Sequence, residues 1–145
     1  PLLEAGGAWE VVTRYRTSAG AKRAILAFGA PAFLGGEAAE TLNGRGMATD
    51  VYIVNGLPLP EDTLEDLLSN YSEGVVTIED GKIGTSETGL RGFAGLVAAS
   101  AGGIPTAHVG VTDPRIAPSE SHLGTWAHFG ITAEALVEAV EGVSG

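Results

Sequence analysis

Short apolar segments alternate with amphipathic ones along most of this chain. Residues 24–28 (AILAF), 50–54 (DVYIV) and 74–79 (GVVTIE) are mainly apolar and rich in β-branched residues. This pattern is typical of strands that are buried on both faces of a parallel sheet. Residues 9–16 (WEVVTRYR) alternate and carry charges, which favours a strand at a sheet edge. Between these strands, apolar residues recur at helical spacing, so strands and helices are expected in alternation.

The predicted strands are residues 9–16, 24–28, 50–54, 74–79 and 105–109, and the predicted helices are residues 32–43, 61–69 and 90–100, with a last helix capped by Thr132. Connections between parallel strands are nearly always right-handed, which places helices on both faces of the sheet. The sequence therefore predicts a three-layer α/β/α domain with a largely parallel sheet. Residues 1–8 are interpreted as a linker or a cut edge, and residues 9–145 as one domain.

Composition narrows the classes of partner. The 145 residues include 18 acidic and 8 basic side chains, a formal net charge of −10, which repels nucleic acid and anionic membrane surfaces. The chain has no cysteine, so it has no disulfide framework or thiolate nucleophile, and a cytoplasmic setting is expected. The most apolar run, residues 24–36, is too short and too interrupted to span a bilayer. We expect neither a nucleic-acid nor a membrane partner.

The nucleotide-binding motifs that α/β domains often carry are missing. After residue 28 the turn reads GAPAFLGG, which does not match the G-x-G-x-x-G dinucleotide fingerprint. Residues 79–82 (EDGK) lack the upstream glycine and the following Ser or Thr of a P-loop. No G-x-S-x-G elbow and no H-E-x-x-H motif occurs.

All the histidines gather in or just before residues 110–132 (GVTDPRIAPSESHLGTWAHFGIT): His108, His122 and His128. His122 and His128 are too far apart to share one helix face, so we predict no metal site here. We also favour a structural role over a Ser-His-Asp triad, because nearly any polar loop offers those residue types. The triad would consist of Ser119 or Ser121, His122 and Asp113. The residues expected to anchor this loop to the core are Trp126, Phe129 and Ile131.

Three segments, taken in order, resemble the C-terminal domain of the transketolase family of thiamine diphosphate enzymes. They are residues 37–59 (EAAETLNGRGMATDVYIVNGLPL), 74–81 (GVVTIEDG) and 119–140 (SESHLGTWAHFGITAEALVEAV). The chain departs from the family at residues 87–95 (ETGLRGFAG), where a paired glycine is usual. The resemblance implies a five-stranded mixed sheet between helices, whose first strand is antiparallel and lies at the edge.

The resemblance also implies what this chain lacks. The family binds thiamine diphosphate and Mg²⁺ through a G-D-G…N-N motif and a glutamate on other domains, and this chain has no G-D-G and no Asn-Asn pair. We therefore expect no catalytic, cofactor-binding or metal-binding residue here. The resemblance implies a non-catalytic C-terminal domain of an enzyme that transfers two-carbon ketol units between sugar phosphates. The domain would serve dimer assembly and active-site shaping, with a second copy or other parts of the enzyme as partners.

Two other functions are consistent with the sequence: an anion or small-molecule binding module, and the partner-docking domain of a 2-oxoacid dehydrogenase or oxidoreductase. A binding module would use the crevice at the carboxyl edge of the sheet. The candidate residues for such a site are Gly29, Ala30, Glu79, Asp80, Gly81, Arg115 and Ser119.

Three of these candidates have competing interpretations. Glu79 and Asp80 end a predicted buried strand, where adjacent acids could serve acid-base chemistry, but we favour a pair that caps the next turn. Arg115 offers a bidentate fork for phosphate, or an ion pair with Asp113 or Glu120.

Overall fold

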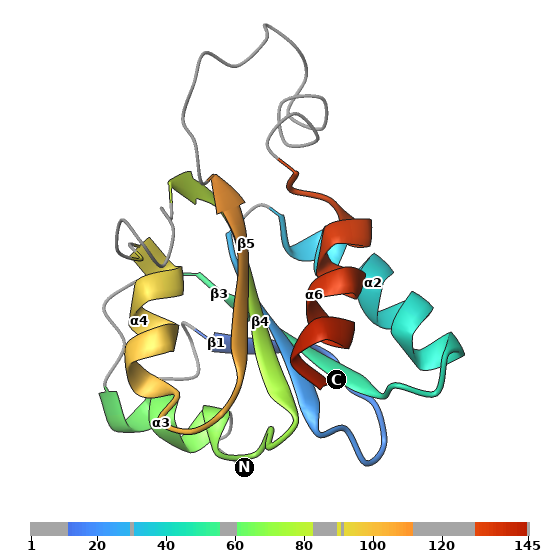
Figure 1. Ribbon diagram of the computed structural model, residues 1–145, viewed down its shortest axis with the longest axis horizontal. Coiled ribbons are helices and arrows are strands. Elements are labelled where there is room, and N and C mark those ends of the chain that lie inside the picture. The colour runs from blue at the N-terminus through green and yellow to red at the C-terminus, as the bar shows by residue number, and fades with distance from the viewer. Residues whose placement is uncertain are drawn as a thin grey trace, which may run out of the picture.

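The computed structural model describes residues 12–29, 31–55, 61–82, 90, 92–111 and 130–144. Its strands are β1 (Val12–Arg16), β2 (Arg23–Phe28), β3 (Thr49–Val54), β4 (Gly74–Lys82) and β5 (Thr106–Val111), and its helices are α2 (Ala32–Gly44), α3 (Glu61–Leu68), α4 (Gly92–Ser100) and α6 (Ala133–Ser144). The alternation expected from the sequence is confirmed (Figure 1). The expected linker and the first residues of the first predicted strand, together residues 1–11, lie outside the described residues.

The sheet is mixed, as the resemblance implied. Its strand order is β1-β3-β2-β4-β5. β1 pairs with β3 in antiparallel fashion, and the other neighbouring strands are parallel. The predicted edge position and antiparallel direction of the first strand are therefore confirmed.

The two strands at the other side of the sheet are longer than predicted. β4 continues past residue 79 to Lys82, and β5 continues past residue 109 to Val111. Lys82 pairs with Val111 beyond a register shift that begins after Ile78. Each strand thus extends the other, an effect that the polar sequence EDGK does not reveal by itself.

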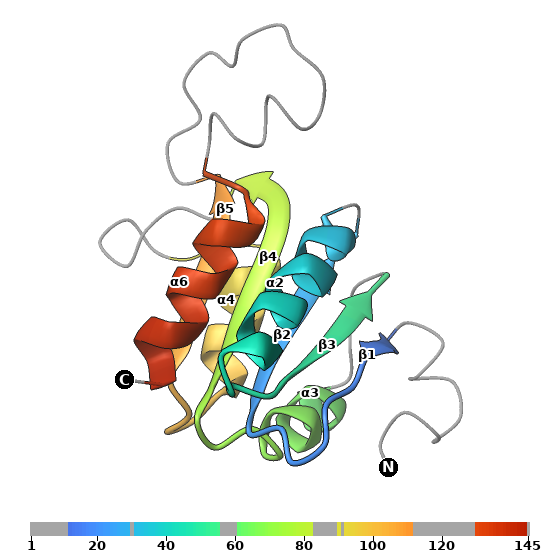
Figure 2. The same ribbon diagram turned by 90° about the vertical axis from the view of Figure 1, so that its right-hand side faces the viewer.

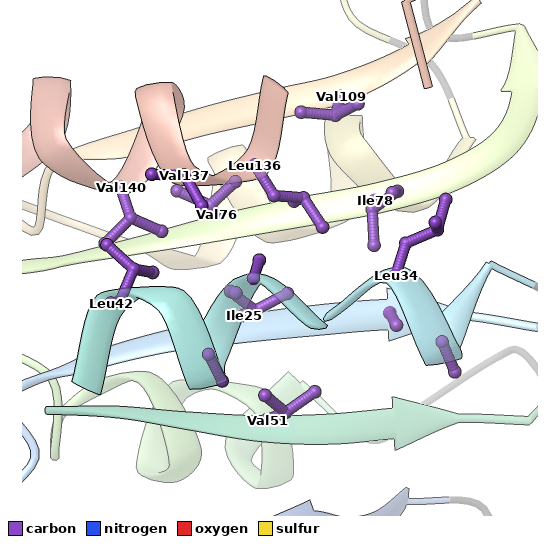
Figure 3. Packing of buried hydrophobic residues seen from close by; sticks show 14 of the residues in the cluster. Ile25, Leu34, Leu42, Val51, Val76, Ile78, Val109, Leu136, Val137 and Val140 are labelled. Atoms are coloured by element: carbon purple, nitrogen blue, oxygen red, sulfur yellow. The ribbon is translucent and has the colours of Figure 1, made fainter. Parts of the chain in front are cut away.

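Helices cover both faces of the sheet and make the three layers visible in Figures 1 and 2. On one face, Ile25 and Val76 pack with Leu42 of α2 and with Leu136 and Val140 of α6 (Figure 3). On the other face, a second cluster joins the strands to α3 and α4; its members include Leu26, Tyr52, Leu64, Phe93 and Val97. Successive residues of β2 therefore enter opposite cores, which explains its continuous apolar run.

The helices lie close to the sheet because small residues face it. A Cβ atom added at Gly35 of α2 would lie 3.1 Å from Val51 Cγ1, so glycine there allows close contact with β3.

None of the helices in the described residues combines the length and apolar character needed to cross a bilayer.

Candidate functional site

Gly29 turns the chain from β2 into α2 at the carboxyl edge of the sheet. Its φ of 75° lies in the left-handed region, its N–H donates to the Val54 carbonyl at 3.2 Å, and its carbonyl accepts from the Ala32 N–H at 3.3 Å. Gly29 is thus engaged in the backbone of the turn. The neighbouring candidate, Ala30, lies outside the described residues.

Glu79 lies in β4, the strand next to β2, and Ala27 pairs with Ile78 just before it. The Glu79 side chain is buried, with 5% exposed, and its Oε1 accepts a hydrogen bond from the Ala94 N–H at 2.8 Å. Ala94 is in the first turn of α4, whose N–H groups have no partners within the helix. The carboxylate therefore caps α4 and interacts favourably with the positive end of the helix dipole.

Gly92 makes room for this cap. Its φ is +59°, and a Cβ atom at this position would lie 3.0 Å from Glu79 Oε2. A side chain at residue 92 would therefore be strained in its backbone and crowded against the carboxylate. Because the Glu79 carboxylate accepts the Ala94 N–H, this donor at the N-terminus of α4 is not open to an external anion.

The remaining crevice candidates are only partly placed. Asp80 and Gly81 belong to β4, which runs past the predicted strand end at residue 79, and their side-chain surroundings lie outside the described residues. Arg115 and Ser119 lie outside the described residues, as do His122, His128, Trp126 and Phe129. Of the expected loop anchors, Ile131 is described and is 2% exposed. Gly29 and Glu79 are thus the two described candidates whose surroundings are defined.

His108 lies in β5 and bonds to a neighbouring strand. Its Nδ1 is 2.7 Å from Thr77 Oγ1, while its Nε2 is buried and has no hydrogen-bond partner among the described residues. Burial lowers the pKa of His108, so the folded protein favours the neutral ring. A proton on Nδ1 that is donated to Thr77 is the less costly arrangement, because a proton on Nε2 would be a buried donor without an acceptor.

No group of three or more His, Asp or Glu side chains in the described residues comes close enough together to hold a metal ion. The residues that the resemblance would require for thiamine diphosphate and Mg²⁺, a G-D-G motif and an Asn-Asn pair, do not occur in the sequence.

A polar network that the sequence interpretation missed lies at the amino end of the sheet. The Tyr71 hydroxyl donates to Asp50 Oδ2 at 2.7 Å and is 2.5 Å from the Tyr52 hydroxyl, while Asp50 Oδ1 accepts from the Ser18 N–H at 2.7 Å. Burial, followed by the hydrogen bonds to Tyr52 and Asp50, raises the pKa of Tyr71 well above its ordinary value. The one sequence signal for this network is an aspartate at the start of an apolar strand.

Two surface depressions adjoin α6. One has a volume of about 480 Å³, lies between α2 and α6, and is lined by Glu37, Arg45, Glu134, Glu138 and Glu141 among others. The Arg45 guanidinium forms an ion pair with Glu141 at 3.0 Å. The other depression, of about 410 Å³, lies between β5 and α6; its lining includes His108, Val109, Gly110, Ala135, Glu138 and Ala139. Both combine elements far apart in the chain, so no local motif could have revealed them.

The sequence matches no family model, and no curated protein is significantly similar to it. Solved structures do resemble it. A split-gene transketolase, in an inactive β4 tetramer, has a TM-score of 0.76 and 24% identity over 92% of this chain and 42% of that chain. Transketolase from Leishmania mexicana has a TM-score of 0.64 and 19% identity over 92% of this chain and 18% of that chain. For Campylobacter jejuni transketolase the TM-score is 0.60, with 18% identity over 94% of this chain and 19% of that chain.

The chain thus spans less than half the length of each of these transketolases. The resemblance stated from the sequence is confirmed at the level of the fold: this chain has the same fold as a part of these transketolases.

Proposed function

We propose that this chain is a non-catalytic domain of a transketolase-like, thiamine diphosphate-dependent enzyme that transfers two-carbon ketol units between sugar phosphates. The observation that carries the proposal is the likeness to the split-gene transketolase, which extends over 92% of this chain but only 42% of that one. In this proposal the domain helps to assemble the oligomer and shapes the approach to an active site built by other parts of the enzyme. The cytoplasmic setting belongs to the same proposal.

The described carboxyl edge is compatible with a supporting role. Glu79, the buried acid at this edge, has its carboxylate held by the first turn of α4, so it is committed to helix capping. When bound to the complete enzyme, thiamine diphosphate would supply the carbanion chemistry of ketol transfer. The contribution of this chain would be to bind the catalytic parts and hold them in position.

Calorimetry on this chain tests the non-catalytic part of the proposal. Titration with thiamine diphosphate and Mg²⁺ should give no heat of binding, because the sequence lacks the G-D-G and Asn-Asn residues through which the family holds them. Micromolar binding by this chain alone would contradict the proposal.

Reconstitution tests the enzyme assignment. Sequencing the reading frame and its neighbouring genes should identify a region or chain that carries a G-D-G…N-N motif. With that polypeptide purified apart from this chain, ketol transfer between sugar phosphates should depend on mixing the two. Equal turnover with and without this chain would exclude a role in assembly and active-site shaping, and absence of any such polypeptide would remove the enzyme assignment.

A further inference from the structure

The contact between His108 and Thr77 joins the last two strands of the described sheet. The two residues are register partners of β5 and β4, and His108 Nδ1 lies 2.7 Å from Thr77 Oγ1. Ala107 and Val109, on either side of His108, pack on the α6 side of the sheet. Because side chains alternate along a strand, the imidazole lies on the other side, which α3 and α4 cover. The contact is therefore a side-chain bond across the last ladder of the sheet.

This contact satisfies one nitrogen of the ring and leaves the other without a partner. His108 Nε2 is buried and bonds to none of the described residues, and Thr77 is fully buried. A neutral ring can carry its single proton on Nδ1 and donate it to Thr77, so that only a lone pair on Nε2 is left over. A charged ring carries a proton on both nitrogens, and the one on Nε2 would be a buried donor without an acceptor. The closed structure therefore accommodates the neutral ring and not the charged one.

The elements on the imidazole side of the sheet bring one ionisable side chain with defined surroundings besides His108. Glu79 of β4 lies on this side, because its carboxylate bonds to the first turn of α4. α4 (GFAGLVAAS) has no ionisable side chain, and β5 (TAHVGV) has none besides His108. The other ionisable residues of β4 are Asp80 and Lys82, whose side-chain surroundings lie outside the described residues.

On the opposite side of the sheet, Glu138 of α6 lines a depression to which His108 also contributes. Burial lowers the pKa of His108, so neither Glu79 nor Glu138 compensates for the loss of water around the ring. An opened structure would return the ring to water, where it takes up a proton at its ordinary pKa of about 6.5.

We propose that protonation of His108 opens the ladder between β4 and β5, so that this side of the sheet loosens in acid before the rest of the fold. β4 pairs with β2 as well as with β5, whereas β5 is the last strand in the described sheet order. Parting this ladder breaks the bond to Thr77 and lets water reach Nε2, while the pairing of the other four strands is kept. The inference goes beyond the proposed function and is tested on this chain alone.

The direction of the pH dependence follows from linkage. The opened state binds a proton more readily than the closed state, so closure is fully favoured above the unfolded pKa of about 6.5 and less favoured below it. Below that value, the equilibrium constant for opening should rise by up to about tenfold per pH unit, until the pH reaches the lowered pKa of the closed state. Glutamates ordinarily titrate at about 4.3, so the range from about pH 7 to about pH 5 reports mainly on histidine.

Native-state hydrogen exchange measures the opening of each ladder separately. The amide protons bonded between β4 and β5 are compared with those bonded between β2 and β3, after correction for the intrinsic pH dependence of exchange. As the pH falls through this range, protection of the β4–β5 amides should fall severalfold relative to that of the β2–β3 amides. Equal losses on both ladders, or an unchanged ratio, would overturn the proposal.

Substitutions identify the group that responds. His108→Asn places an amide where Nδ1 lies and removes the ring, so the ratio of the two protections should no longer depend on pH. Thr77→Val is the matched control, because it removes the hydrogen bond but keeps the ring. In this variant the β4–β5 amides should be less protected at every pH and should still lose protection in acid. Glu79→Gln should also retain the acid dependence. Loss of that dependence in Glu79→Gln, or its persistence in His108→Asn, would overturn the proposal.

NMR of the imidazole nitrogens in the wild-type chain supplies a test that requires no variant. At neutral pH the proton should be on Nδ1 and Nε2 should carry none, and in the folded chain the His108 ring should titrate below about 6.5. A ring that titrates at or above that value in the folded chain would provide no free energy to open the ladder, which would overturn the proposal.

Discussion

Asp50 and Glu79 lie at opposite ends of the sheet, and both accept hydrogen bonds from N–H groups that are distant in the sequence. Asp50, at the amino end of β3, accepts from the Ser18 N–H and from the Tyr71 hydroxyl. Glu79, toward the carboxyl end of β4, accepts from the Ala94 N–H at the start of α4. At the amino end, Asp50 thus holds two connecting segments against the sheet through hydrogen bonds to its side chain. At the carboxyl end, Glu79 holds the start of α4 through a hydrogen bond and a favourable interaction with the helix dipole.

This difference bears on function because parallel α/β sheets usually bind ligands at the carboxyl ends of their strands. Here the buried acid at that end is engaged in holding α4. A side chain with such a structural commitment is poorly placed to transfer protons to a substrate. The carboxyl edge therefore fits the supporting role proposed for this chain. Substitutions at either end of the sheet should lower the free energy of unfolding.

The largest effect is expected for Glu79→Ala, which leaves the Ala94 N–H buried without a partner and opens a void. We expect the free energy of unfolding to fall by about 2–4 kcal/mol, measured by urea denaturation. Glu79→Gln retains an acceptor and should cost about 1 kcal/mol. Glu65, exposed on α3, provides the control, and its change to Ala should cost less than about 0.5 kcal/mol. Equal losses for Glu79→Ala and Glu65→Ala would refute the capping role.

At the amino end, Tyr71→Phe removes the hydroxyl that joins Asp50 to Tyr52. The loss should be about 1–2 kcal/mol of unfolding free energy, because two polar groups lose a partner while the ring remains. Tyr15→Phe is the matched change, since the Tyr15 hydroxyl accepts only an exposed hydrogen bond from Arg16 among the contacts described. It should alter stability by less than about 0.5 kcal/mol. If the two changes cost the same, the network contributes nothing beyond an exposed contact.

Alkaline titration separates the two ends further. The pKa of Tyr71 is raised in the folded state by burial and by its neighbours Tyr52 and Asp50, so folding favours the protonated phenol. The stabilisation is complete below the unfolded value near 10, and above it stability should fall by about 1.4 kcal/mol per pH unit. Tyr71→Phe should have a shallower alkaline decline, whereas Glu79→Gln should follow the wild-type slope. An unchanged slope in Tyr71→Phe would show that Tyr71 titrates normally.

The two ends also differ in how far the sequence predicts them. Glu79 ends an apolar run, so a capping role could be anticipated, although β4 itself continues to Lys82. Its partner Ala94 lies beyond residues 83–89 and could not be identified without the chain path. Asp50 and Tyr52 share one predicted strand, but Tyr71 lies in the segment before β4, and only the parallel packing of β3, β2 and β4 brings it to them. Contacts between distant segments depend on the tertiary structure. Hydrophobic periodicity describes only local structure, so it does not predict them.

The same distinction applies to the fold. Strand β2 was predictable to within one residue because a strand buried on both faces has a continuous apolar sequence. The ends of β4 and β5 were not, because Lys82 and Val111 extend the two strands by pairing with each other. Local sequence therefore fixes the existence and type of each element better than its last residues.

The smallest effect concerns the crowding between Gly92 and Glu79. Gly92 and Gly102 have nearly the same left-handed φ, +59° and +60°, but only at Gly92 would an added Cβ atom meet a neighbour, Glu79 Oε2 at 3.0 Å. Each alanine substitution should cost about 1 kcal/mol for the backbone conformation. Gly92→Ala should cost about 0.5–1 kcal/mol more than Gly102→Ala, because the carboxylate must move and weaken its bond to Ala94. In the Glu79→Ala background the crowding is gone, so the two glycine substitutions should become equal in a double-mutant cycle. Persistence of the excess in that background would mean that it arises from the start of α4 itself and not from contact with Glu79.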